Sequence, residues 1–210
     1  MILDLVFYSD LQSLKRNAKL LGIDAIIIAQ NFKSQRDIDS LRAEIKKSKF
    51  PFYICHLLGG ANQNDAKLFR GKADFIAVLG GSANLNKFAV SSNFVDFLIA
   101  PAGYGKNEFD TAIAQIASDN QKPIAIPFAQ FLNCSGFQRS MLFKNYFFVV
   151  KIMKKFRLNA LFFSGAKKES ELRAPQDFAS FANLLGFSKE QGERFIGRYA
   201  ETIMPGNKNE

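Results

Sequence analysis

The sequence has few of the residues that metal and catalytic sites usually need. Its 210 residues include one histidine, His56, and two cysteines, Cys55 and Cys134. A zinc or dinuclear site needs three or more His, Cys or carboxylate ligands directed at one centre, and neighbours such as Cys55 and His56 point to opposite faces of a strand. We therefore expect His56 to be a core or hydrogen-bonded histidine. We also expect the protein to bind no metal and no other cofactor.

Motifs for nucleophilic and nucleotide chemistry are also absent. The chain has no Gly-x-Ser-x-Gly turn and no second histidine for a catalytic triad. Walker and Rossmann glycine fingerprints are missing too. The turn GGSANLNK at 80–87 could cradle a phosphate at the start of a helix. We assign no catalytic residue, and two alternatives stay open: a metal-dependent phosphoesterase barrel, or an α/β-barrel enzyme that acts on a phosphorylated ligand.

Long apolar runs and a basic leader are lacking as well. No stretch of about 18 uninterrupted apolar residues exists, which argues against a membrane span. The start, MILDLVFYSD, carries Asp4 and no basic segment, so it predicts a first strand and not a signal peptide. Two cysteines give no disulfide framework, which is typical of a reducing compartment. We expect a cytoplasmic protein.

Acidic residues are fewer than basic ones. Lys and Arg number 28 and Asp and Glu 19, so the net charge is +9 and the pI is about 9.6. Between Arg139 and Arg173 there are nine basic residues and two acidic ones. A basic patch attracts phosphate backbones through counterion release. The alternative is a basic surface that only keeps the protein soluble.

Seven short apolar runs alternate with amphipathic segments. These runs are rich in Ile, Val, Phe and Leu without strict alternation, which is typical of strands covered on both faces. We predict strands in 2–8, 23–29, 52–58, 74–80, 95–101, 123–128 and 160–165, and helices in 10–21, 34–48, 84–91, 107–119, 138–157, 175–185 and 189–200. This order predicts parallel β/α units in a TIM-barrel-like α/β barrel of about seven strands, with a doubly wound open sheet as the alternative. One domain should cover 1–205, followed by a polar tail, 206–210.

The segment from Arg139 to Arg157 has two distinct predicted faces. Its apolar positions recur at helical spacing, as an inward face would require; they are Leu142, Tyr146, Val149, Met153 and Phe156. On another face lie Lys144, Lys151 and Lys155, with Phe148 between them. A cationic face with an aromatic residue suits RNA or a protein partner, whereas the alternative is a solvated charge stripe.

Several phrases of the sequence, taken in order, resemble one known family. The phrases are LLGIDAIII (20–28), GGSANLNKFAV (80–90) followed by VDFLIAP (95–101), NCSGFQRSMLFKNY (133–146) and FFSGAKKESELRAPQDFASFANLLGF (162–187). They are similar to a glycine pair followed by Asn-Arg/Lys, a Ser-Gly-x-x-Arg turn before a basic helix, and a Ser-Gly-Ala segment before Leu-Arg-Ser/Ala-Pro. In this order they resemble protein component three of archaeal and eukaryotic ribonuclease P, the thirty-kilodalton subunit family, over about residues 1–205.

The resemblance implies a TIM-barrel-like fold related to the polymerase-and-histidinol-phosphatase phosphoesterases, without their metal centre. It implies a subunit of a ribonucleoprotein endoribonuclease that removes 5′ leaders from precursor tRNA. In that family the RNA carries out the Mg²⁺-dependent hydrolysis, and the protein binds and supports this RNA together with a second small subunit, component two, and other ribonuclease P proteins. Precursor tRNA would then be an indirect partner.

The chain departs from the family pattern at several polar positions. Ala100-Pro101 replaces a common His-Pro, Lys167 stands where a histidine often follows Ser-Gly-Ala, and Gln176 replaces an arginine. With this resemblance, we expect RNA contacts from eight basic residues: Lys87, Arg139, Lys144, Lys151, Lys155, Lys167, Lys168 and Arg173. For Arg173 the alternative is a bond or cap that orders the turn before Pro175.

Overall fold

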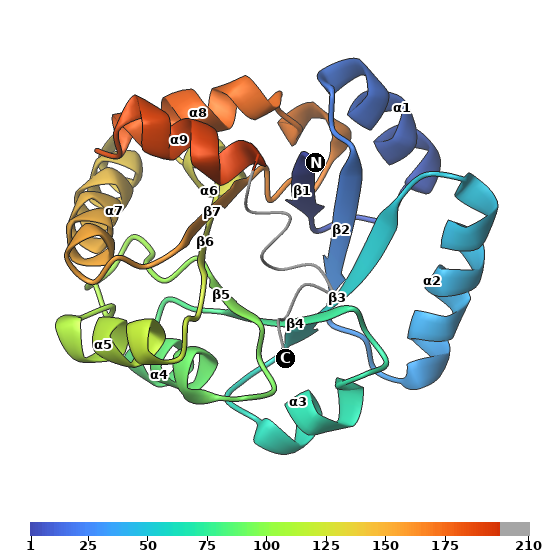
Figure 1. Cartoon of the computed structure of the whole chain (residues 1–210), viewed down its shortest axis with the longest axis horizontal. Helices are drawn as coiled ribbons and strands as arrows, with labels where there is room; N and C mark the ends of the chain where they lie inside the picture. The colour runs from blue at the N-terminus through green and yellow to red at the C-terminus, as the bar shows by residue number, and fades with distance from the viewer. Residues whose placement is uncertain (198–210) are drawn as a thin grey trace.

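The computed structural model describes residues 1–197, in which seven parallel strands form a ring surrounded by helices (Figure 1). The strands are β1 (Leu3–Val6), β2 (Ala25–Gln30), β3 (Phe52–Leu58), β4 (Phe75–Leu79), β5 (Phe97–Ile99), β6 (Ile124–Pro127) and β7 (Ala160–Phe163). Each strand pairs in parallel with the next in the chain. The prediction of a seven-stranded parallel barrel is confirmed, and the open doubly wound sheet is wrong.

Helices follow every strand and cover the outside of the ring (Figure 1). They are α1 (Leu11–Leu21), α2 (Gln35–Ser48), α3 (Gln63–Phe69), α4 (Ala83–Ser91), α5 (Thr111–Asp119), α6 (Ala129–Leu132), α7 (Gly136–Lys155), α8 (Pro175–Leu184) and α9 (Lys189–Gly197), with a 3-10 turn η1 (Glu169–Glu171). The sequence prediction missed α3, α6 and η1, which are short. The end of the last predicted helix and the polar tail lie outside the described residues. No helix in 1–197 is both long and apolar enough to cross a membrane.

The strands separate two hydrophobic layers. Inside the ring, Leu5, Phe75 and Phe97 belong to a small core to which every strand contributes. On the outer faces, Val6 and Ile26 join the larger core beneath the helices. Because both faces are buried, the strands need continuous apolar runs, which explains why they were recognisable in the sequence.

The ring closes at a seam between β1 and β7, where a side chain supplements the backbone ladder. The N–H of Phe7 donates to the carbonyl of Ala166 at 2.7 Å, and the N–H of Gly165 donates to that of Leu5 at 2.9 Å. Beside these bonds, Oδ1 of Asp4 accepts two backbone N–H groups, that of Ser164 at 2.6 Å and that of Leu5 at 2.8 Å. Asp4 is 1% exposed, and burial raises the pKa of its carboxyl to about 6. A buried carboxylate therefore joins the first strand to the last.

At the opposite end of the barrel, the same contact between an aspartate and a neighbouring strand occurs three times. Asp24, Asp74 and Asp96 each lie directly before a strand. Each carboxylate accepts a backbone N–H at the start of the preceding strand, at 2.7, 2.7 and 2.8 Å respectively. Arginines hold two of these carboxylates in place, with Arg70 bound to both oxygens of Asp96 at 2.8 Å. These aspartates tie neighbouring strands together at their amino ends, and the carboxyl ends remain for a site.

Candidate nucleic-acid interface and barrel mouth

The carboxyl ends of all seven strands surround a cavity of about 520 Å³. Its walls combine apolar and aromatic groups with side-chain amides and one ammonium group. The lining residues are Phe7, Ala29, Gln30, Asn31, Leu57, Leu79, Ala100, Tyr104, Pro127, Ala129, Gln130, Asn133, Gly165 and Lys167. This end of a parallel barrel is where function normally resides. We call this cavity the mouth cavity.

Two backbone features shape the mouth cavity. Gly165 has a φ of +58°, and a Cβ on it would lie 2.6 Å from Cβ of Pro127, so only glycine fits at this position. Ala100 has a φ of +51°, a strained conformation for a residue with a side chain, and it directly precedes Pro101. Strain of this kind is concentrated at functional sites. The backbone at the rim of this barrel is therefore held in conformations that cost free energy at Ala100 and require glycine at position 165.

The loop after β7 positions Lys167 at the mouth cavity. The buried carboxylate of Glu171 accepts the backbone N–H of Lys167 at 2.8 Å and Nδ2 of Asn133 at 3.1 Å. The Lys168 ammonium lies 3.9 Å from the same carboxylate. Lys167 and Lys168 are both exposed, and Lys167 lines the mouth cavity. The backbone of this loop is thus fixed, while the ammonium group of Lys167 pairs with no other described side chain.

Arg173 makes contacts that order the same loop. Its Nη1 donates to the carbonyls of Ser170 at 3.0 Å and Leu172 at 2.7 Å, and its guanidinium lies 5.9 Å from the ring centre of Phe128. These are the contacts expected of a residue that orders the turn before Pro175. The guanidinium still has nitrogens beyond Nη1, so a contact with RNA remains a prediction.

Substitution of Arg173 separates these two roles. Arg173→Lys keeps the positive charge but loses the two carbonyl bonds, so we expect thermal unfolding to show a loss of about 1 kcal/mol of stability, with RNA affinity nearly unchanged. Lys168→Gln, which removes a positive charge from the same loop after β7, serves as the comparison for RNA binding. Unchanged stability together with a clear loss of RNA affinity in Arg173→Lys would show that the guanidinium grips phosphate instead.

Helix α7 presents a cationic and aromatic outer face. Its inward residues are as predicted: Leu142, Tyr146, Val149 and Met153 are buried and Phe156 is half-buried. Lys144, Lys151 and Lys155 are all exposed, and Phe148 between them is 52% exposed. Phe137 and Phe147 are also exposed, at 79% and 46%. We call the exposed residues Phe137, Lys144, Phe147, Phe148, Lys151 and Lys155 the α7 face.

The predicted basic residues do not all lie at one end of the barrel. Arg139 lies in the first turns of α7, which follows the carboxyl end of β6, and its Nε donates to the carbonyl of Cys134 at 2.8 Å. The helix then runs away from the mouth, so that Lys155 lies about 24 Å along its axis from Arg139. Lys87 is exposed on α4, on a separate element. The eight residues thus lie on three elements. The loop after β7 carries Lys167, Lys168 and Arg173, helix α7 carries Arg139, Lys144, Lys151 and Lys155, and α4 carries Lys87.

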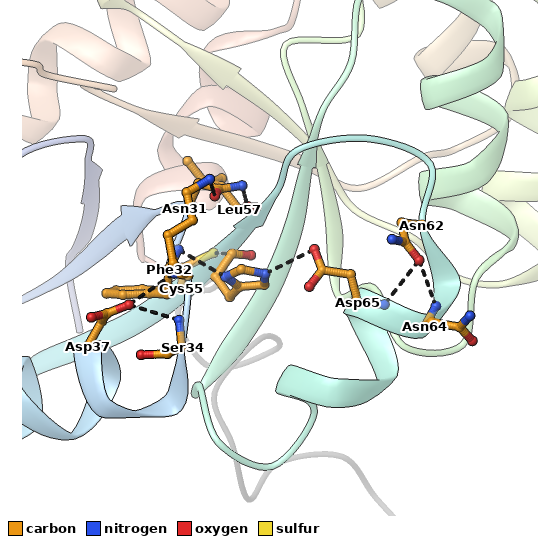
Figure 2. Close-up of polar contacts among 11 residues, drawn as sticks. Asn31, Phe32, Ser34, Asp37, Cys55, Leu57, Asn62, Asn64 and Asp65 are labelled. Atoms are coloured by element: carbon orange, nitrogen blue, oxygen red, sulfur yellow. Dashed lines mark hydrogen bonds and ion pairs between the residues drawn. The ribbon is translucent and has the colours of Figure 1, made fainter.

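His56 is a core residue, as predicted. It is fully buried, its ring stacks on Phe69 with 3.8 Å between ring centres, and its Nδ1 accepts the N–H of Phe32 at 3.3 Å. Its Nε2 lies 3.6 Å from Oδ2 of Asp65. Figure 2 draws this contact as a dashed line that ends at Asp65. Burial lowers the pKa of the imidazole, and Asp65 partly offsets this effect. His56 therefore joins the loop after β2 to α3 as a neutral ring.

Within residues 1–197, no three His, Cys, Asp or Glu side chains gather in a way that could hold a metal ion.

The GGSANLNK turn has a structural explanation. The buried side chain of Asn86 accepts the N–H of Gly81 at 3.2 Å and donates to the carbonyl of Pro101 at 2.9 Å. A Cβ on Gly80 would lie 2.2 Å from Oδ1 of Asn86, so the first glycine is needed for this approach. The backbone N–H of Gly81 is thus already engaged by Asn86. The turn links the rims of β4 and β5.

Sequence reasoning missed the aromatic part of the mouth cavity. Tyr104 lines the cavity and is 41% exposed. Its loop is held by Asn145, whose Nδ2 donates to the carbonyls of Gly103 and Gly105, each at 2.7 Å. The hydroxyl of Tyr146 donates to Gln130, which in turn donates to the carbonyl of Ala102. The only signal in the sequence was the Gly-Tyr-Gly spacing after Pro101.

These features define a seven-stranded parallel (β/α) barrel with a basic, amide-lined mouth and a basic aromatic helix on its flank. The model of the family described as RNase P subunit p30 matches residues 6–209. The chain therefore belongs to the RNase P subunit p30 family.

Curated relatives agree with this assignment, and a solved structure shares the fold. Ribonuclease P protein component 3 of Methanococcus maripaludis is 28% identical in strain C7, over 81% of this chain and 76% of the relative, and 27% identical in strain C6, over 88% and 82%. A chain in the cryo-EM structure of archaeal ribonuclease P with mature tRNA has the same fold, with a TM-score of 0.80 and 22% identity over 96% of this chain and 89% of that chain.

Proposed function

We propose that this chain is a protein subunit of the ribonuclease P ribonucleoprotein, where it binds and supports the catalytic RNA during removal of 5′ leaders from precursor tRNA. Membership of the RNase P subunit p30 family across nearly the whole chain carries this proposal. The relatives named ribonuclease P protein component 3 align over about three quarters or more of their own length. The proposal therefore rests on a match along most of the chain and not on a single motif.

In this proposal the RNA supplies the chemistry and the protein supplies binding surfaces. The Mg²⁺ ions belong to the catalytic RNA, and the protein needs no metal to fold. The nine basic residues between Arg139 and Arg173, against two acidic ones, favour contact with phosphates. The protein would work in the cytoplasm with a second small subunit, component two, and would meet precursor tRNA through the RNA.

Two surfaces are suited to RNA contact. On the α7 face, lysines that can hold phosphates lie among exposed phenyl rings on which bases can stack. At the mouth, Lys167 and Lys168 stand on a loop whose backbone is already fixed by Glu171, so that little ordering is needed on binding. Arg139 and Lys87 would add separate phosphate contacts. Because Arg173 is committed to two backbone carbonyls, its contribution to RNA binding is smaller than that of the lysines.

Reconstitution with and without this chain tests the function. Ribonuclease P RNA with the remaining protein subunits should cleave precursor tRNA faster at low Mg²⁺ when this chain is added, because its cations replace counterions around the folded RNA. The chain alone should cleave nothing, and added chelator should not change its thermal unfolding. A cleavage rate that is the same with and without the chain over a range of Mg²⁺ concentrations would overturn the proposal.

A further inference from the structure

We propose that the mouth cavity binds a single nucleotide unit, with its phosphate at Lys167 and its base against the aromatic and amide walls. The size of the cavity fits such a ligand: its volume of about 520 Å³ lies within the range of about 300–1,000 Å³ usual for small-molecule sites. The RNA form of this ligand rests on the proposed function, whereas a free nucleoside monophosphate does not. The chemistry is the same in both cases.

The walls offer the groups that a nucleobase needs. Phe7 and Tyr104 provide aromatic surface, and Leu57 and Leu79 provide apolar surface. Every base has a flat face that stacks on aromatic rings, with an energy of about 1–3 kcal/mol per base. A sugar phosphate without a base would leave these walls uncovered. The aromatic surface therefore favours a nucleotide over a simple phosphorylated metabolite.

The amides of the cavity differ in how far they are already engaged. Asn31 donates to the carbonyl of Leu57 and accepts from Lys33, and Gln130 is held between Tyr146 and Ala102. The side chain of Gln30, half-buried at the end of β2, makes no hydrogen bond to any described residue. Its amide carries a donor and an acceptor side by side, which can pair with the edge of a base. Asn31 and Gln130 thus build the wall, and Gln30 is the side chain that can read a ligand.

Charge at the mouth cavity favours an anion. Among the described residues that line it, Lys167 is the only charged one. The carboxylate of Glu171, on the same loop, is engaged by Asn133, by the backbone N–H of Lys167 and by the Lys168 ammonium. Within residues 1–197 the Lys167 ammonium has no carboxylate partner, and such a group at the rim of an apolar cavity can hold a phosphate as a point charge. RNA-binding proteins commonly take up unstacked bases in this manner.

Titrations of the intact protein with nucleotides test this inference. Nucleoside 5′-monophosphates should shift the NMR signals of the Gln30 side-chain amide and of residues 165–167, and should bind about tenfold more tightly than the matching nucleosides. Lys167→Ala should remove this tenfold advantage, and Tyr104→Ala should weaken nucleosides and monophosphates alike. Lys46→Ala, which removes an exposed charge on α2, should change neither. Ribose 5-phosphate and inorganic phosphate should bind more weakly than the monophosphates.

Three results would overturn the nucleotide site: no shift at the mouth with any monophosphate, an equal effect of Lys46→Ala and Lys167→Ala, or inorganic phosphate binding as tightly as the monophosphates. Competition by a short single-stranded oligoribonucleotide assigns the site to a nucleotide of RNA, and its absence assigns the site to a free nucleotide. If reconstituted cleavage depends on the chain but nucleotides do not bind, only this inference fails. If nucleotides bind but the chain has no effect on cleavage, only the proposed function fails.

Discussion

An Asp4→Ala variant should unfold with a free energy about 3 kcal/mol lower than that of an Asp4→Asn variant, because alanine leaves two buried N–H groups without an acceptor. In the native protein Oδ1 of Asp4 accepts the N–H groups of Ser164 and Leu5. Asparagine keeps this oxygen in the same place and therefore keeps the β1–β7 seam. Chemical denaturation of both variants at neutral pH measures the difference. Equal stabilities would show that the backbone bonds of the seam are sufficient without the carboxylate.

The pH dependence of the native protein and Asp4→Asn provides a second measure of the same carboxylate. The pKa of Asp4 is raised from 3.8 to about 6 by burial, so the folded state binds a proton more tightly than the unfolded state does. Stability contributed by Asp4 is therefore present at low pH and falls as pH rises through the interval between those two values. As the pH rises across this interval, the free energy of unfolding of the native protein should fall by about 3 kcal/mol relative to that of Asp4→Asn. A constant difference would mean that water reaches the carboxylate.

Removing the three predicted lysines of the α7 face should produce the largest loss of RNA binding. In a Lys144→Gln, Lys151→Gln, Lys155→Gln triple variant, we expect affinity for ribonuclease P RNA to fall by about 30-fold at moderate salt, and the slope of log affinity against log salt to shrink by about 2 to 3. All three side chains are exposed, so the fold should be retained. Filter binding over a salt series measures both quantities.

A matched triple variant separates a surface from an overall charge. Lys19, Lys46 and Lys47 are exposed on α1 and α2, and their replacement by glutamine changes the net charge by the same amount. We expect this control to have a small effect on affinity. Equal losses in the two triple variants would show that binding depends on total charge, and the α7 face would lose its assigned role. In that case Phe148→Ala should also leave RNA affinity unchanged, since no base would stack on the Phe148 ring.

The barrel could be predicted because its strands are buried on both faces. Runs such as 23–29 and 52–58 have no polar alternation and match β2 and β3 closely. α3 was missed because it is only seven residues long and buries just Ala66 and Phe69, so that its start depends on the cap from Asn62 and not on periodicity. Short helices of this kind have no repeating pattern for sequence reasoning to detect.

The candidate site was predictable only in part. Lys167 and Lys168 were placed correctly at a strand end because the chain order of a parallel barrel brings such ends to one rim. Tyr104 was not found, since its position depends on hydrogen bonds from Asn145, some forty residues later in the chain. For Arg173 the sequence offered both an RNA contact and a bond that orders its own turn, and residue types alone could not decide between the two. Local pattern gives the elements, whereas long-range polar contacts decide which side chains remain available to a ligand.

The seam has a consequence for how the chain is made. Asp4 and Ser164 are 160 residues apart, so the bond between them cannot form until most of the polypeptide has left the ribosome. During synthesis β1 can pair with β2 on one side, while the backbone groups of its other edge stay unpaired until β7 has been made. An uncovered strand edge can recruit strands from other chains. Closure of the ring is thus a late event, and the nascent protein is most exposed to aggregation just before its last strand emerges.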